Sequence, residues 1–210
     1  MPRTAHPSPP APPAAADTGP LGVILAGGQG RRMGGCNKAW ITWQDRPLIA
    51  HAIERLQGQV NDVVVSTNTE MDRCRRLGFP CVADEYPDYR GPLAGVAAAG
   101  AARPGRDLLC LPVDAPLAPG DLARRLQAAR AEHAAPAAMA HDGQRLQPLF
   151  LLLGAGLVPA LRAAVAEGPV AAGAWLREYG AITADFSDNP GAFVNLNTPE
   201  DLAAAGPAGP

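Results

Sequence analysis

The chain has 210 residues, which is enough for one globular domain and too few for several. Charged residues make up 18% of it and the formal net charge is -2, so no general attraction draws it to nucleic acid or to an anionic membrane. A phosphate-bearing ligand must therefore be bound by a local site and not by the field of the whole molecule.

The two ends of the chain are predicted to lie outside the folded unit. Residues 1–20 are rich in proline and alanine and lack the continuous apolar core of a signal peptide. We expect a disordered leader over 1–20, one folded domain over 21–204 and a flexible tail over 205–210. No segment is apolar for long enough to span a bilayer, so no membrane association is expected.

The four cysteines indicate a reducing compartment. Cys36, Cys74, Cys81 and Cys110 show no C-x-x-C spacing and no nearby histidine pair, so neither a disulfide framework nor a zinc site is expected. Cys110 lies in an apolar run and is predicted to be a buried thiol. The expected location is the cytoplasm.

The folded part alternates between strand and helix patterns along the chain. In chain order the predicted strands are 21–26, 62–66, 79–83, 107–113, 137–140, 147–153 and 181–185. The predicted helices are 47–56, 71–77, 92–102, 121–132, 156–166, 171–179 and 199–204. Pro47 is placed in the first turn of the first helix. This alternation indicates a single α/β domain of Rossmann-like character, with three layers and a mostly parallel central sheet.

Polar or glycine-rich chemistry follows each of the first four predicted strands. The first is followed by GGQGRRMGGCNK, the second by Ser66 and Asn68, the third by Asp84 and the fourth by Asp114. In open α/β sheets, ligands bind beyond the carboxyl ends of the strands. The sequence therefore predicts one ligand site at this edge of the sheet.

The glycine-rich segment over residues 25–38 has the composition of a triphosphate-binding loop. Its glycines permit backbone conformations that turn several N–H groups toward one point, and Arg31, Arg32 and Lys38 add cationic donors. It is not a Walker loop, because neither Ser nor Thr follows the lysine, and it does not match G-x-G-x-x-G. A flexible loop with solvated arginines is the alternative.

Four motifs resemble the molybdenum cofactor guanylyltransferases, within the wider sugar-nucleotide-pyrophosphorylase-like family. They are LAGGxxxRMGGxxK after the first strand, YRGPLAG at 89–95, LPVDAP at 111–116 and FVNLNTPE at 193–200. In order and spacing they cover nearly all of residues 21–203. The combination is specific, whereas each motif alone is moderate evidence.

This resemblance assigns functional roles to two carboxylates. Asp114 follows an apolar strand, where a carboxylate can hold Mg²⁺ against the α-phosphate, and the matching aspartate of similar proteins is the metal ligand. Its alternative is the N-cap of a helix that begins at Pro116. The resemblance implies that Asp84 contacts the guanine base, since a carboxylate can accept hydrogen bonds from the N–H groups of guanine. The alternative is that Asp84 is a solvated carboxylate in a loop.

Two further segments are less specific evidence for ligand binding. Gly91 precedes Pro92 at a predicted helix start, which the resemblance places beside the nucleotide, although a helix start alone explains the pattern. Asn195 and Asn197 flank Leu196, so an extended backbone sends both amides to one face. There they could hold a phosphate, a pterin or a metal-bound water, or could cap the turn before a helix.

The chain departs from the family pattern at three places. The family usually has aspartate before the loop lysine, where this chain has Asn37, and an asparagine where this chain has Ser66. Both changes keep hydrogen-bonding capacity, and Asn68 follows two residues after Ser66. The stretch 169–177 is often rich in arginine in the family and has only one arginine here. This departure leaves open which residues bind the phosphate of the acceptor.

The resemblance implies a magnesium-dependent nucleotidyltransferase. It would transfer GMP from GTP to the phosphate of molybdenum-molybdopterin, releasing pyrophosphate and forming the guanine dinucleotide cofactor. Residues 21–118 would bind the nucleotide and 119–204 the acceptor, and molybdoenzymes or their chaperones are further expected partners. One alternative is a cytidylyltransferase acting on molybdopterin or on a sugar or polyol phosphate, although LAGG in place of LAAG favours guanine. The other is a non-catalytic GTP-binding chaperone for molybdoenzymes.

The predicted site therefore combines catalytic and binding positions. The residues assigned to catalysis are Lys38, Arg32 and Asp114, with Asp114 as the metal ligand. Those assigned to nucleotide binding are Leu25, Ala26, Gly27, Gly28, Gly30, Arg31, Lys38, Ser66, Asn68, Asp84, Gly91, Asp114, Asn195 and Asn197.

Overall fold

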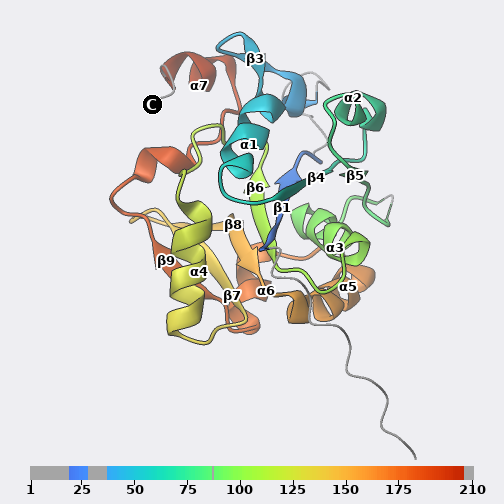
Figure 1. Cartoon of the computed structure of the whole chain (residues 1–210), viewed down its shortest axis with the longest axis vertical. Coiled ribbons are helices and arrows are strands. Elements are labelled where there is room, and N and C mark those ends of the chain that lie inside the picture. Colours follow the sequence, from blue (N-terminus) through green and yellow to red (C-terminus); the bar gives the residue numbers. More distant parts are fainter. Residues whose placement is uncertain (1–18, 28–36, 87, 206–210) are drawn as a thin grey trace, which may run out of the picture.

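A computed structural model describes residues 19–27, 37–86 and 88–205 of the chain. Its centre is one seven-stranded sheet with helices on both faces (Figure 1). The strands of this sheet are β1 (Leu21–Leu25), β4 (Asp62–Ser66), β5 (Cys81–Val82), β6 (Leu108–Pro112), β7 (Ala137–His141), β8 (Leu146–Leu153) and β9 (Ile182–Asp185). The α-helices are α1 (Leu48–Gln57), α2 (Met71–Arg75), α3 (Pro92–Ala102), α4 (Leu122–Glu132), α5 (Val158–Glu167), α6 (Ala172–Glu178) and α7 (Pro199–Ala204).

The sheet has the order β5-β4-β1-β6-β8-β7-β9. Every pair of neighbours is parallel except those that include β8, which runs antiparallel to β6 and to β7. The prediction of a mostly parallel sheet is therefore confirmed. Because β1, β4 and β6 are parallel neighbours, their carboxyl ends lie at one edge, and the amino end of β8 lies at the same edge.

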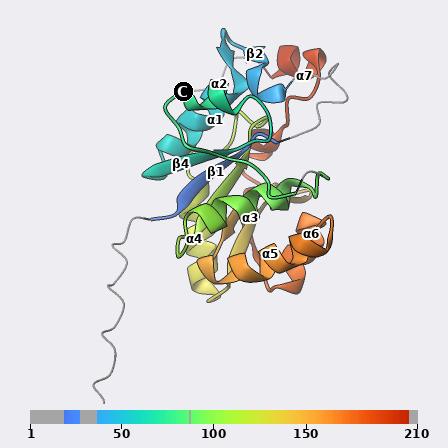
Figure 2. The ribbon, with the colours of Figure 1, turned by 90° about the vertical axis from the view of Figure 1, so that its right-hand side faces the viewer.

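The sheet separates two apolar cores, which makes the fold three-layered. Along β1, Ile24 packs on the side of α1 and α4, whereas Val23 and Leu25 pack on the side of α3, α5 and α6. Figure 2 shows α3, α5 and α6 together on one side of the sheet. All five residues of β1 are buried, as expected for a strand covered on both faces.

The predicted helical spacing of the first helix is also confirmed. The apolar positions Leu48, Ile49, Ala52, Ile53 and Leu56 are all buried along one side of α1. The assignment of Pro47 to the first helical turn was wrong by one residue. Pro47 has an extended backbone and forms the N-cap of α1, because it also pairs in a short strand before the helix.

That strand belongs to an element that the sequence did not predict. Thr42–Trp43 (β2) and Arg46–Pro47 (β3) form a two-stranded hairpin, preceded by a single 3-10 turn, η2, at Lys38–Trp40. Strands of two residues are too short for alternation to show in sequence. Trp43 packs against Leu48 and Leu196, so the hairpin joins the amino-terminal half to the last motif of the chain.

The structure also bears on the expectations for the two termini, the buried cysteine and membrane-spanning segments. The predicted leader, apart from Gly19 and Pro20, and the tail beyond Ala205 lie outside the described residues. Cys110 is fully buried in β6, as predicted, and burial raises the pKa of its thiol. Among the described helices, none is long and apolar enough to cross a membrane.

Candidate nucleotide-binding site

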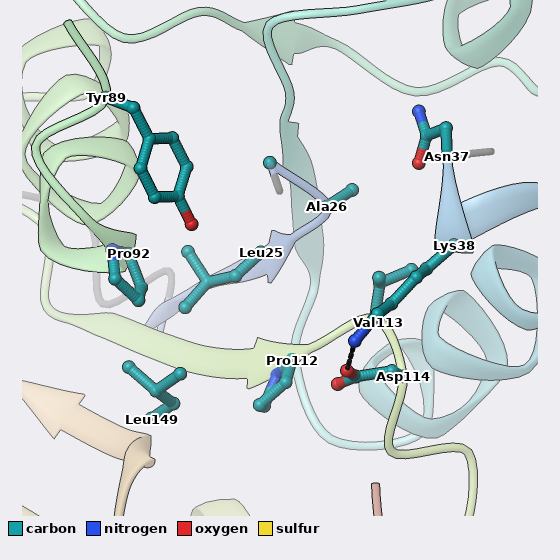
Figure 3. Close-up of a pocket in the computed structure, with 11 residues that line it drawn as sticks. Leu25, Ala26, Asn37, Lys38, Tyr89, Pro92, Pro112, Val113, Asp114 and Leu149 are labelled. Atoms are coloured by element: carbon teal, nitrogen blue, oxygen red, sulfur yellow. Dashed lines mark hydrogen bonds and ion pairs between the residues drawn. The ribbon is translucent and has the colours of Figure 1, made fainter. Parts of the chain in front are cut away.

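A cleft opens at the carboxyl ends of β1 and β6 (Figure 3). It is lined by Leu25, Ala26, Gly27, Asn37, Lys38, Tyr89, Pro92, Pro112, Val113, Asp114 and Leu149. An adjoining hollow shares four of these residues and adds Ser66, Asp84, Gly91 and Gly95. The cleft thus runs from a charged end at Lys38 to a second end at Asp84, along the edge where the sequence predicted a ligand site.

Backbone hydrogen bonds hold this edge together. The N–H of Val113 donates to the carbonyl of Leu25 at 3.1 Å, and the N–H of Ala26 donates to that of Ser66 at 2.8 Å. The N–H of Leu196 donates to the carbonyl of Asp114 at 2.7 Å. The ends of three neighbouring strands and the FVNLNTPE motif are therefore fixed relative to one another.

Lys38, Asp114 and Asn197 meet at the charged end. The Lys38 ammonium lies 3.0 Å from Oδ2 of Asp114 and also donates to Oδ1 of Asn197. The Asp114 side chain is only 15% exposed, so the ion pair is partly shielded from water. The helix-cap interpretation of Asp114 was wrong, because the next helix, α4, begins at Leu122.

The turn at Lys38 is fixed by Asn37. This side chain caps the 3-10 turn, with Oδ1 accepting from the N–H of Ala39 at 3.0 Å, and its Nδ2 donates to Oγ1 of Thr69 at 3.0 Å. Asparagine in place of the family's aspartate therefore supplies both an acceptor and a donor. Aspartate would supply only acceptors when ionised.

One of the two asparagines of the last motif contacts Lys38, which lines the cleft. Leu196 is buried, and Thr198 starts α7 with a capping box in which its side chain and that of Asp201 bond to each other's backbone N–H. The same Asp201 carboxylate accepts from the N–H of Asn197 at 2.9 Å. Neither asparagine is itself among the residues that line the described cleft; Asn195 is exposed, and the amide that accepts from Lys38 is that of Asn197.

At the other end, Ser66 and Asp84 face the first turns of α3. A Cβ placed on Gly95 would lie 2.1 Å from Oγ of Ser66 and 3.4 Å from Oδ1 of Asp84, so only glycine permits this approach. Asp84 is also bonded to Asn68, which itself is exposed and does not line the hollow. Burial raises the pKa of the Asp84 carboxyl, and the hydrogen bond from Asn68 opposes that rise.

The loop before α3 carries a cleft residue that the sequence motifs did not predict. Tyr89 lines both parts of the cleft, and its ring reaches toward Leu25 in Figure 3. Its φ of 48° lies in the left-handed region, which costs a non-glycine residue about 1 kcal/mol or more. Gly91 follows with φ 87°, as the N-cap of α3. The only signal in the sequence was the position of Tyr89 in YRGPLAG.

Arg90 holds this strained loop in place. Its Nε donates to both carboxylate oxygens of Asp88, and its Nη1 donates to the carbonyls of Val165 and Ala166 at 2.7 and 2.6 Å. Its guanidinium also lies 3.8 Å from the ring centroid of Tyr86. Arg90 therefore ties the loop to the carboxyl end of α5.

The remaining expected positions are not among the described residues that line the cleft. Gly28, Gly30, Arg31 and Arg32 fall outside the described residues. The arginine-poor stretch 169–177 includes most of α6, whose Trp175 and Leu176 are buried, and none of its residues lines the described cleft.

The donor set at the charged end suits a magnesium ion that is shared with a ligand. Among the described residues there is no group of three or more His, Cys, Asp or Glu side chains that could cage a metal. A carboxylate and an amide oxygen do converge, and they already hold a cation, the Lys38 ammonium, between them. Mg²⁺ is commonly bound by one or two carboxylates together with substrate phosphates and water.

The mostly parallel seven-stranded sheet covered by helices is the fold of the α/β nucleotidyltransferases. Residues 22–182 match the MobA-like NTP transferase domain, and the chain belongs to that family.

Individual relatives agree with the family. The chain is 40% identical over 186 residues to the molybdenum cofactor guanylyltransferase of Shewanella halifaxensis, covering 89% of this chain and 93% of that protein. It is 41% identical over 178 residues to the enzyme of the same name from Shewanella loihica, covering 85% and 91%. The structure of molybdopterin-guanine dinucleotide biosynthesis protein A from Archaeoglobus fulgidus shares the fold, with a TM-score of 0.72 at 19% identity, covering 88% and 96%.

Proposed function

We propose that the protein transfers GMP from GTP to the terminal phosphate of molybdenum-molybdopterin, releasing pyrophosphate and forming the molybdopterin guanine dinucleotide. The observation that carries this proposal is the meeting of Lys38, Asp114 and Asn197 at one end of a cleft whose other end holds Asp84. The relatives at 40 and 41% identity, which are molybdenum cofactor guanylyltransferases by name, support the same reaction.

In the proposed complex the nucleotide lies along the cleft. The guanine occupies the end at Ser66 and Asp84, beside the amino-terminal turn of α3, and the triphosphate extends past Gly27 to Lys38. Polar and cationic donors are needed at the phosphate end, and an ionised acceptor at the base end. The opposite chemistry of the two ends supports this orientation. Residues 21–118 then provide most nucleotide contacts, and 119–204 provide the acceptor side.

Asp114, with Asn197 beside it, would hold the magnesium ion. When bound, the ion supplies Lewis-acid stabilisation of the charge that develops on the α-phosphate and the pyrophosphate. The Lys38 ammonium, which lies between these two oxygens, then turns to the phosphate oxygens.

The chemical step needs no protein base. A phosphate oxygen of the acceptor, already an anion, attacks the α-phosphorus of GTP in line and forms a new P–O bond. The bond from the α-phosphorus to the oxygen bridging it to the β-phosphorus breaks, and its electron pair leaves with pyrophosphate. No proton has to move. The residues of the cleft act by positioning and by charge stabilisation.

The test is direct product analysis. The full chain is incubated with GTP, Mg²⁺ and molybdenum-molybdopterin, pyrophosphate is measured, and the pterin product is identified by mass. We expect the guanine dinucleotide, with far lower yield from CTP or ATP. Equal turnover with CTP would replace the proposal with cytidylyl transfer, and GTP binding without any pyrophosphate would replace it with a non-catalytic role.

A further inference from the structure

Asp84 is held by two reciprocal hydrogen bonds to Asn68. Nδ2 of Asn68 donates to Oδ2 of Asp84 at 2.9 Å, and the backbone N–H of Asp84 donates to Oδ1 of Asn68 at 2.8 Å. One amide side chain therefore fixes both the backbone and the carboxylate of Asp84. The two residues are 16 positions apart, after β4 and after β5, so the pair also joins the ends of two neighbouring strands.

This pair leaves the Asp84 carboxylate with unused acceptor capacity on both of its oxygens. Oδ1 makes no hydrogen bond to any described residue. It lies close to Gly95, because a Cβ placed on Gly95 would be 3.4 Å from it. Oδ2 uses one lone pair on Asn68 and keeps another. Asp84 lines the hollow, whereas Asn68 is exposed and is not among the residues that line it.

The charge of the carboxylate matters as much as its direction. Burial raises the pKa of Asp84, which favours the neutral acid, and the donor from Asn68 favours the ionised form. If the Asp84 carboxyl group were protonated, one of its oxygens would carry a donor, and the two oxygens would no longer be equivalent acceptors. Asn68 is thus the described partner that both orients the carboxylate and supports its charge.

We propose that Asn68 is a positioning residue for base selection, which acts on the nucleotide through Asp84 and does not touch it. Guanine presents two adjacent donors, N1–H and N2–H₂, which match two carboxylate oxygens held at a fixed angle. Adenine and cytosine present a donor beside an acceptor, and the acceptor would face a negative oxygen. Hypoxanthine, the base of ITP, keeps N1–H and lacks the amino group. This proposal rests on the proposed use of GTP, and it replaces the direct nucleotide contact that the sequence assigned to Asn68.

The test measures binding of Mg·GTP and Mg·ITP by calorimetry, which needs no acceptor. Wild type is expected to prefer GTP about tenfold or more, because a hydrogen bond to a charged acceptor is lost with ITP. Asn68→Ala should weaken GTP binding about tenfold and ITP binding less, so that the preference shrinks. Asn68→Asp keeps the acceptor for the Asp84 N–H but replaces the donor with a like charge, and should weaken GTP binding at least as much. Asn189→Ala, at an exposed asparagine after β9, should change neither affinity.

Transfer kinetics separate positioning from a general structural role. In Asn68→Ala we expect a raised KM for GTP with kcat nearly unchanged, since the charged end of the cleft is intact. The proposal is overturned if wild type binds GTP and ITP equally, or if the preference survives in both Asn68 variants. Equal losses for both nucleotides with a lowered melting temperature also overturn it. GTP-selective binding without transfer would instead refute the proposed function and leave this inference standing.

Discussion

Replacing Asp114 with asparagine tests the centre of the site with the smallest possible change. Asp114→Asn keeps the size of the side chain and one oxygen acceptor for the Lys38 ammonium, which lies 3.0 Å away. It removes the negative charge that would balance a divalent cation. The variant therefore separates a role in folding from a role in catalysis.

The expected loss of stability is small. At 3.0 Å and an effective dielectric constant of about 20, the attraction in the ion pair is about 5 kcal/mol. Desolvation of the two charges cancels most of that attraction, and asparagine retains a neutral hydrogen bond. A neutral bond is weaker than a charged one by about 1 kcal/mol, so the melting temperature should fall by about 2 to 4 °C.

The expected loss of activity is much larger. Removing one preorganised charge from the reacting centre typically lowers kcat by about a hundredfold to a thousandfold. GTP affinity should fall less, because Lys38, Gly27 and the Asp84 end of the cleft are unchanged.

Melting temperature and magnesium-dependent pyrophosphate release are measured on the same sample. Asp121→Asn makes the same chemical change at a half-exposed aspartate before α4. The Asp121 side chain caps no backbone N–H and pairs with Arg124 away from the cleft, so kcat should stay at the wild-type value. An Asp114→Asn enzyme with normal turnover and normal magnesium dependence would refute the assignment of Asp114.

Four further outcomes are expected. Lys38→Ala should lower transfer at least a hundredfold and weaken GTP binding, because a charged phosphate donor is lost, as measured by single-turnover kinetics. Gly95→Ala should destabilise the fold by about 1 to 3 kcal/mol in chemical unfolding, since its new Cβ would lie 2.1 Å from Oγ of Ser66, and Ser66→Ala in the same chain should recover part of that loss. Although burial opposes it, hydrogen bonds from the following turn lower the pKa of Asp142 from 3.8 to about 2. The stability from Asp142 is therefore present above pH 3.8 and lost as the pH falls toward 2, and Asp142→Asn should flatten that part of the unfolding profile. Deleting residues 1–17 should leave melting temperature and turnover unchanged, because that segment has no apolar periodicity with which to pack.

The sequence by itself determined the layered fold and the edge that carries the site. Buried strands such as β1 and β6 read as continuous apolar runs, and α1 shows helical spacing, since these patterns follow from local geometry. Parallel strands bring their carboxyl ends together, so Asp84 and Asp114 could be placed near one another without knowledge of any contact. Lys38 followed from its place in the glycine-rich motif.

Only the tertiary structure decided which groups touch. Lys38 is 76 residues from Asp114 and 159 from Asn197, and no local pattern encodes a pairing across such separations. The same holds for the Asn68–Asp84 pair and for Tyr89, whose place in the cleft depends on the anchoring of Arg90 to α5. Sequence periodicity reports which side of an element faces the core. The partner of a polar side chain is set by how loops from distant elements meet at the sheet edge, and that is fixed only when the whole chain has packed.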